Sequence, residues 1–406
     1  MVSTMGHTHH SFQDEDSSSG SAPLLGWNMS KPSTLKFWTA SAEKVQMSKF
    51  WALGRKFFFG LSELNYGCSS WILSSQYASD LYEAGVKLWR KEDLLDIEAQ
   101  LARSFETEYF TVRRIDGVVA RIKNPMYRIQ NPIWAPRLKT QGYWRLVRIK
   151  PDGPPETYLC SYLLEWKNQT VPRYEGVIEY SKSLFETKRQ LWNNSITCEL
   201  FRAQLQRLLN TGKRRITKVV CFGLGDMVTK TAEWEMKHRR ETEQQASETS
   251  DIEGSLIQHA MALTMAEAIR HHTGVSVELK AQDPGYREQT NEILSENGFK
   301  IVGKCGAGGF AEIDEDTLVF AAFASTAISE VLADIARPAL VITTGGEKTF
   351  CDHTKVFSDA ESPRTRQMWC EYSVSHFSVP SPELELFKPL TQMSIRTRMP
   401  GVKGAK

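Results

Sequence analysis

The fold of this chain is decided by the stretch KVVCFGLGD, which spans residues 218–226. A basic residue leads into four apolar ones, and a Gly-x-Gly turn follows at Gly223 and Gly225. A short apolar run that ends in such a turn is typical of a buried parallel strand whose end lets a ligand approach the backbone. The stretch therefore predicts the first strand of an open α/β sheet.

The sequence after this strand alternates regularly between helical and strand patterns. Helices are predicted at 255–272, 284–297 and 327–336, and further strands at 275–281, 299–303, 317–323 and 339–343. This order is that of a mostly parallel sheet with helices on both faces. We therefore predict a Rossmann-like α/β domain over residues 211–346, with a polar insert at 237–251.

The segments on either side of this domain have different patterns. Residues 1–49 are polar and low in apolar content, which predicts a disordered N-terminal tail. Residues 50–210 mix helical and strand patterns and predict an α+β extension, with one long helix over 181–210. Residues 347–406 predict an irregular C-terminal segment with a short helix from Pro363.

Composition narrows the class of protein. The chain has 406 residues, of which 41% are hydrophobic and 24% charged, as in soluble globular proteins. Its 50 basic and 48 acidic residues give no electrostatic reason to expect nucleic acid or an anionic membrane as a partner. Seven cysteines without a CxxC pair, and no secretory leader, predict reduced thiols. We expect a cytoplasmic or nuclear protein without a membrane span.

The region from about 210 to 346 resembles the SRR-like domain, a family named after the plant protein "sensitivity to red light reduced". The resemblance rests on residues 219–225, on Asp283-Pro284 after a strand, on Leu294-x-x-x-Gly298-Phe299 and on the closing strand 337–341. The region before it is similar to the extension common in fungal members. Animal and plant members tend to carry a His-Cys-containing turn after the fourth strand. Here residues 321–325 read AAFAS, so no role of that turn is carried over.

The resemblance implies a Rossmann-like fold and a regulatory function. Members are linked to circadian rhythm in plants, and to haem biosynthesis and cytoskeletal phenotypes in yeast. The biochemical activity of the family is not settled, so the resemblance implies no reaction. It favours an interaction protein with a protein partner.

Six residues are candidates for a ligand site at the carboxyl edge of the predicted sheet: Gly223, Gly225, Asp226, Asp283, Ser325 and Gly345. An acidic residue after the second strand, such as Asp283, is placed to accept hydrogen bonds from ribose hydroxyls. Each polar candidate also has a structural alternative. Asp283 followed by Pro is an ordinary helix start, Asp226 is suited to capping its turn, and Ser325 is suited to capping the next helix.

The glycine turn bears on the choice of cofactor. A full dinucleotide motif needs a third glycine, but positions 227 and 228 are Met and Val. This argues against NAD more than against S-adenosylmethionine, which has no pyrophosphate. Our leading hypothesis is a regulatory protein that binds a nucleotide-like ligand at this edge. The alternative is a methyltransferase-like enzyme that uses S-adenosylmethionine. A third hypothesis is a scaffold whose edge is filled by side chains.

The remaining motifs and residue groups predict neither a catalytic site nor a metal site. No catalytic triad, GxSxG motif or P-loop is found, so no catalytic residue is predicted. Cys351, His353, Cys370 and His376 have one residue between the first pair, fewer than structural zinc sites use, and we predict no metal site. The interaction-protein hypothesis predicts an exposed apolar patch, for which four tryptophans of the extension are candidates: Trp134, Trp144, Trp166 and Trp192.

Overall fold

The computed structural model describes residues 70–151, 153–170, 176–212, 215–241, 247–322, 326–344, 359–391 and 393–401. The expected tail over residues 1–49 lies outside this part of the chain. The helices are α2 (Ser70–Glu83), α3 (Lys91–Ala102), α4 (Tyr143–Arg148), α6 (Ser181–Asn193), α7 (Ile196–Thr211), α8 (Glu233–Glu241), α9 (Glu253–Thr273), α10 (Glu288–Glu296), α11 (Gly308–Ala311), α12 (Ile328–Ile335) and α13 (Pro363–Trp369). The strands are β1 (Tyr109–Arg113), β2 (Val119–Lys123), β3 (Trp134–Thr140), β4 (Tyr162–Asn168), β5 (Lys218–Phe222), β6 (Glu278–Gln282), β7 (Phe299–Ile301), β8 (Thr317–Ala321), β9 (Leu340–Thr344), β10 (Tyr372–Phe377) and β11 (Met393–Arg398).

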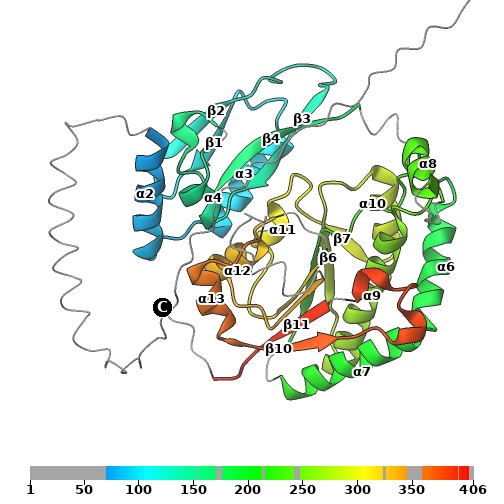
Figure 1. Cartoon of the computed structure of the whole chain (residues 1–406). Helices are drawn as coiled ribbons and strands as arrows, with labels where there is room; N and C mark the ends of the chain where they lie inside the picture. The colour runs from blue at the N-terminus through cyan, green and yellow to red at the C-terminus, as the bar shows by residue number, and fades with distance from the viewer. Residues whose placement is uncertain are drawn as a thin grey trace, which may run out of the picture. The chain divides into compact units, whose positions relative to one another are not determined.

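A seven-stranded sheet with the order β10-β11-β9-β8-β5-β6-β7 forms the centre of the described structure (Figure 1). The five strands from β5 to β9 are parallel to one another, which confirms the predicted α/β class. The chain runs outward from β5 to β6 and β7, then returns to β8 on the other side of β5. Open parallel sheets bind ligands beyond the carboxyl ends of their strands, at such a reversal of strand order. The reversal here lies between β5 and β8.

The expectation of an irregular C-terminal segment after residue 346 is wrong in part. Strands β10 and β11 pair with each other and join β9, both in antiparallel fashion. Strand β11 was missed because Arg396 and Arg398 make its sequence look like a solvated segment. The structure buries both side chains and gives them hydrogen bonds, Arg396 to Ser394 and Arg398 to the Arg337 carbonyl oxygen.

Several helix boundaries differ from the predicted ones. The long helix expected over 181–210 is divided into α6 and α7, because Ser195 leaves the helical conformation and its hydroxyl caps α7 by accepting from the Cys198 N–H. The polar insert expected at 237–251 overlaps α8, in which Arg239 pairs with Glu235 and Asp251.

The two faces of the sheet pack against different layers. Val219 and Cys221 of β5 belong to a core shared with α6, α7, α9 and α10. Val220 and Phe222 point to the other face, as side chains on a strand alternate, and share a core with the extension and with α11 to α13. The extension before residue 170 consists of α2, α3, α4 and the antiparallel pairs β1–β2 and β3–β4. It therefore covers one face of the sheet.

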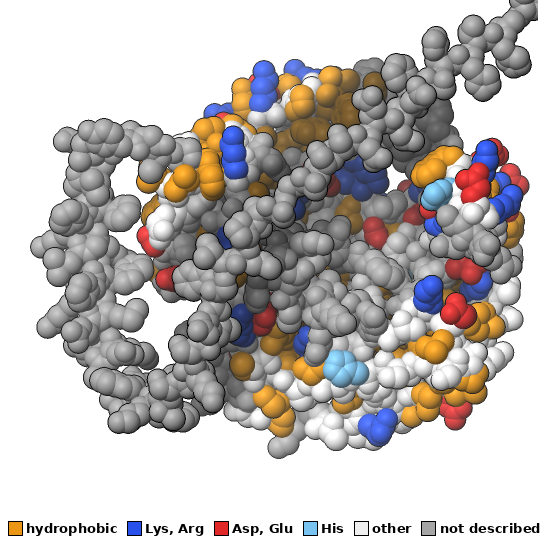
Figure 2. Space-filling model, in the orientation of Figure 1, with side chains coloured by type: hydrophobic (Ala, Val, Ile, Leu, Met, Phe, Trp, Pro, Cys, Tyr) orange, Lys and Arg blue, Asp and Glu red, His pale blue; other side chains and the backbone are white. Residues whose placement is uncertain are grey.

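The expected patch of four tryptophans is wrong. Trp192 is fully buried, and its indole N–H donates to the Thr264 hydroxyl over 2.9 Å. Trp144 and Trp166 are partly buried against the core, and only Trp134, at 41% exposure, faces solvent. Figure 2 shows hydrophobic side chains over this part of the molecule. Other apolar side chains of the extension are exposed instead: Tyr109, Val118, Val119, Ile129 and Ile133.

The described ranges contain neither a membrane-spanning helix nor a metal-binding cluster. None of their helices combines the length and apolar character needed to cross a bilayer. These ranges also hold no group of three or more His, Cys, Asp or Glu side chains arranged to bind a metal ion. Cys351 and His353 lie outside them.

Candidate functional site

A cavity of about 450 Å³ lies at the carboxyl edge of the sheet, beside the reversal of strand order. One wall comes from the ends of the strands and the loops after them: Phe222, Gly223, Gln282, Asp283, Pro284, Gly285, Gly306 and Thr326. The other wall comes from the extension: Arg137, Leu138, Lys139, Thr140, Arg145, Glu165 and Lys167. The edge of the sheet is thus open, which argues against a scaffold filled by its own side chains.

The turn after β5 needs its two glycines. Gly223 and Gly225 have φ angles of +64° and +81°, in the region that side chains with a Cβ rarely adopt. A Cβ at Gly225 would also lie 2.2 Å from the Ser255 hydroxyl oxygen at the start of α9. Gly223 lines the cavity, whereas Gly225 is not among its lining residues.

Asp283 joins the ends of β5 and β6 and lines the cavity. One carboxylate oxygen accepts from the Gly225 N–H and the other from the Gly285 N–H, each over 2.8 Å. The alternative role as a helix cap is wrong, because α10 begins at Glu288 and its N-cap is Arg287. A carboxylate oxygen accepts more than one hydrogen bond, so Asp283 keeps acceptor capacity for ligand hydroxyls.

Asp226 serves the fold around the same turn. Its carboxylate accepts from the backbone N–H groups of Val228, Thr229 and Arg287 and from the Thr290 hydroxyl. It is not among the residues lining the cavity. Its position therefore corresponds to the structural alternative, a cap on the turn.

The remaining two candidates, Ser325 and Gly345, lie outside the described residues. Their described neighbours reach the same edge. Thr326 lines the cavity, and its hydroxyl donates to the Thr140 hydroxyl of the extension over 3.0 Å.

Sequence reasoning missed the wall that the extension supplies. Arg137 of β3 lies opposite Glu165 of β4, and side chains two residues apart share a face, so Lys139 and Lys167 lie on the same side of this ribbon. The alternating charges on both strands are a signal that the sequence contains. It could not show which surface these charges face, because that depends on packing against a distant part of the chain.

Glu98 of α3 attaches the extension to this edge. Its carboxylate accepts from the backbone N–H groups of Cys305, Ala307 and Gly308, over 2.8, 2.9 and 3.1 Å. Successive N–H groups directed at one anion form an anion-binding nest. Here a carboxylate of the same chain occupies the nest and holds the glycine-rich loop. The N–H of Leu138 also donates to the Cys305 carbonyl oxygen, which ties β3 to that loop.

A buried His–Tyr pair supports the loop that carries Asp283. The Nδ1 atom of His259 lies 2.7 Å from the Ser255 carbonyl oxygen, so it must be the donor. The Nε2 atom then accepts from the Tyr286 hydroxyl, over 2.8 Å. Burial lowers the pKa of His259 to about 4, which keeps the ring neutral. The pair therefore fixes the loop after β6 against α9.

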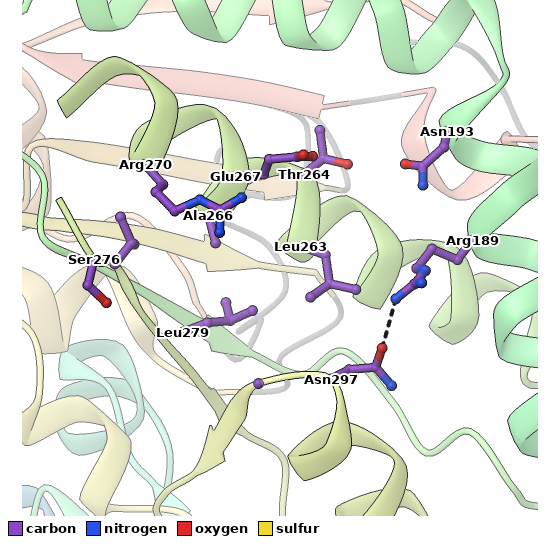
Figure 3. Close-up of a pocket in the computed structure, with 12 residues that line it drawn as sticks. Arg189, Asn193, Leu263, Thr264, Ala266, Glu267, Arg270, Ser276, Leu279 and Asn297 are labelled. Carbon is purple, nitrogen blue, oxygen red and sulfur yellow. Dashed lines mark hydrogen bonds between the residues drawn. The ribbon is translucent and has the colours of Figure 1, made fainter. Parts of the chain in front are cut away.

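A second cavity, of about 420 Å³, lies at the amino ends of β6 and β7 and is lined by α6 and α9 (Figure 3). Two of its charged groups bind neighbouring side chains. Arg189 donates to the Asn297 side-chain oxygen over 2.8 Å, and Glu267 pairs with Arg202. Ligand sites of open parallel sheets lie at the opposite edge. The first cavity is therefore the better candidate.

Comparison with known proteins assigns a large part of the chain to a domain family. The family model described as the SRR1 domain matches residues 188–385, which include every strand of the central sheet except β11. No curated protein matches the chain. The crystal structure of the 23S rRNA methyltransferase ErmE is similar over 50% of this chain and 71% of that chain, at 16% identity and a TM-score of 0.24. A likeness this low carries no argument about function. The match over residues 188–385 shows that this part of the chain is an SRR1 domain.

Proposed function

We propose that this chain is a regulatory or interaction protein whose SRR1 domain binds a nucleotide-like ligand at the carboxyl edge of its sheet. One observation carries the proposal: an open cavity at the reversal of strand order, with Gly223 and Asp283 among its lining residues. Its volume of about 450 Å³ is within the range of small-molecule sites.

The lining suits the parts of a nucleoside. Asp283 is placed at the end of the second parallel strand, where acidic side chains accept hydrogen bonds from ribose hydroxyls. Leu138, which is partly buried, supplies apolar surface for a base.

The interaction part of the proposal has its own support. The exposed apolar side chains Tyr109, Val118 and Val119 lie on the β1–β2 hairpin, away from the cavity lining. Val118 and Val119 are adjacent in the chain, and adjacent exposed apolar groups are a feature of protein-binding surfaces. We propose this hairpin as the place where a protein partner would bind.

A thermal-shift experiment on the full chain tests the ligand site, with adenosine, ADP, NAD and S-adenosylmethionine as probes. A probe present at about 100 times its Kd should stabilise the protein by about 2.7 kcal/mol. Asp283→Asn should remove this shift. The matched control is Asp226→Asn, which loses hydrogen bonds in the same turn but not a lining side chain. It should lower the Tm of the free protein and keep the ligand shift.

The outcomes separate the hypotheses. No shift with any probe would overturn the proposed site. A shift that survives Asp283→Asn would place the ligand elsewhere. A shift with S-adenosylmethionine alone, removed by Asp283→Asn, would favour the methyltransferase-like alternative.

A further inference from the structure

We propose that the ligand of this cavity carries a phosphate group, and that the extension, through the β3–β4 ribbon and α4, is the part of the chain that recognises it. The inference rests on the proposed function, because it concerns the same cavity. It assigns the ribose to the SRR1 domain and the phosphate to the extension.

The charges of the lining carry the inference. The described lining residues include four basic side chains, Arg137, Lys139, Arg145 and Lys167, against the two carboxylates of Glu165 and Asp283. All four basic residues come from the extension, and three of them lie on the β3–β4 ribbon. Arg137 and Arg145 have no side-chain hydrogen bond among the described residues, and two such guanidinium groups on one wall of a cavity attract an anionic group to that wall.

Arg137 is the central residue of this wall. It is half-buried, and burial lowers the pKa of its guanidinium although the carboxylates of Asp283 and Glu165 act in the opposite direction. Within the described part of the chain, no side-chain hydrogen bond of Arg137 is found. A partly desolvated guanidinium without hydrogen-bond acceptors gains most from an anion that accepts two hydrogen bonds at once, as phosphate does.

Arg137 also lies where it would bind the phosphate of a nucleotide whose ribose is bound by Asp283. Arg137 and Asp283 line the same cavity from opposite walls. Asp283 would bind the ribose, and Arg137 the phosphate attached to it. Carboxylate and guanidinium on opposite walls thus match the two neighbouring groups of one nucleotide.

The same charges distinguish between the two nucleoside ligands considered above. S-adenosylmethionine carries a sulfonium and an ammonium group beside a single carboxylate, so its net charge is positive. The guanidinium groups of Arg137 and Arg145 repel such a ligand relative to a nucleoside phosphate, which is negative. The inference is therefore that ADP-like ligands bind in preference to S-adenosylmethionine.

Isothermal titration calorimetry of the full chain with adenosine, ADP, inorganic phosphate and S-adenosylmethionine tests this. The double variant Arg137→Gln/Lys139→Gln removes two cations from the cavity. The matched control is Arg121→Gln/Lys123→Gln, which removes two cations with the same spacing from β2, outside the cavity lining. Lys167→Gln provides a second cavity variant, on the neighbouring strand.

We expect ADP to bind the wild type at least about tenfold more tightly than adenosine. The cavity double variant should lose roughly that factor for ADP and keep its adenosine affinity, whereas the β2 variant should behave like the wild type. ADP affinity should also fall with added salt, because the contact is between charges.

Two outcomes would overturn the inference and leave the proposed function standing. One is equal affinity for adenosine and ADP with no effect of the cavity variant. The other is tighter binding of S-adenosylmethionine than of ADP. If neither adenosine nor any other probe binds, the proposed function itself fails.

Discussion

At the scale of single residues, the glycine turn after β5 and the carboxylate of Asp283 form one unit. The left-handed conformation of Gly223 and Gly225 turns the chain sharply at the cavity, and Asp283 holds this turn from the next strand through the Gly225 N–H. The residue proposed to bind a ribose is therefore already fixed in place by the fold. Such preorganisation reduces the entropy that a ligand must overcome on binding.

Gly225→Ala should lower the free energy of unfolding more than the conformational cost of a left-handed alanine, which is about 1 kcal/mol. The added Cβ would lie 2.2 Å from the Ser255 hydroxyl oxygen, so α9 or the turn must move. The matched control is Gly274→Ala, where φ is +69° and no atom lies within 4 Å of the added Cβ.

Urea denaturation measures the loss of unfolding free energy for Gly225→Ala and for Gly274→Ala, provided that the m-value does not change. Equal losses for the two variants would contradict the close approach of Ser255. Adding Ser255→Ala to the Gly225→Ala variant should bring its loss down to that of Gly274→Ala.

Glu330 of α12 predicts a pH dependence of stability. Burial raises the pKa of Glu330 from its ordinary 4.5 to about 8, and the carboxylates of Asp359 and Asp334 act in the same direction. The folded chain therefore keeps a proton that the unfolded chain loses between pH about 4.5 and about 8. The contribution of Glu330 to the free energy of unfolding therefore falls as the pH rises through that window, by up to about 1.4 kcal/mol per pH unit.

Glu330→Gln should remove this fall, so its stability relative to the wild type should rise with pH. Urea midpoints from about pH 5 to about pH 8 measure the difference. The exposed Glu92→Gln should follow the wild type throughout. Parallel curves for Glu330→Gln and the wild type would show that Glu330 is ionised in the folded protein.

The sequence allowed prediction of the residues that depend on local geometry. Gly223 and Asp283 were identified because each follows a recognisable apolar strand, and strand ends of a parallel sheet meet at one edge. The sequence alone leaves the role of Asp226 open, because a turn cap and a ligand contact require the same residue type. Only the contacts with Arg287 and Thr290 decide which role it has.

At the scale of elements, acidic side chains attach the extension to the SRR1 domain in both directions. Glu98 of α3 binds the loop after β7, as described above. From the other side, Glu330 accepts from the Tyr143 N–H over 2.7 Å, and Asp334 accepts from the Leu88 and Trp89 N–H groups over 2.7 and 3.0 Å. Arg364 pairs with the second oxygen of Asp334. These bonds hold the basic wall opposite the ends of the strands.

Glu98→Ala should destabilise the protein by about 3 kcal/mol, because three backbone N–H groups lose a charged acceptor. Glu92→Ala, on the exposed side of the same helix, should cost less than about 1 kcal/mol. Chemical denaturation gives both values, and hydrogen exchange of residues 305–308 should accelerate only in Glu98→Ala. Unchanged exchange in that loop would contradict the attachment.

Prediction of elements succeeded where one segment determines its own structure. Strands β5 to β9 were found from short apolar runs between helical patterns. Strand β11 and the orientation of β3–β4 were not, because each depends on a partner far away in the chain. The sheet buries Arg398, whose side chain donates to the carbonyl oxygen of the distant Arg337, and β3 faces the cavity because it is bound to the loop at Cys305.

At the scale of the whole molecule, the described chain is one structure with two shared cores. Val220 and Phe222 of the sheet belong to the same core as Leu94 and Phe110 of the extension. The family match begins at residue 188, but one wall of the cavity comes from residues 137–167. The proposed ligand site is therefore a joint product of the SRR1 domain and the extension.

Hydrogen exchange of the full chain with and without ADP, followed by mass spectrometry, tests this central claim most directly. We predict that ADP slows exchange at both walls together: in β3 at residues 134–140, and in the turns after β5 and β6 at 222–226 and 282–287. The second cavity provides the internal control, and its segment at Asn297 should not change. Protection of only one wall, protection at Asn297 instead, or no protection at saturating ADP would contradict a composite nucleotide site.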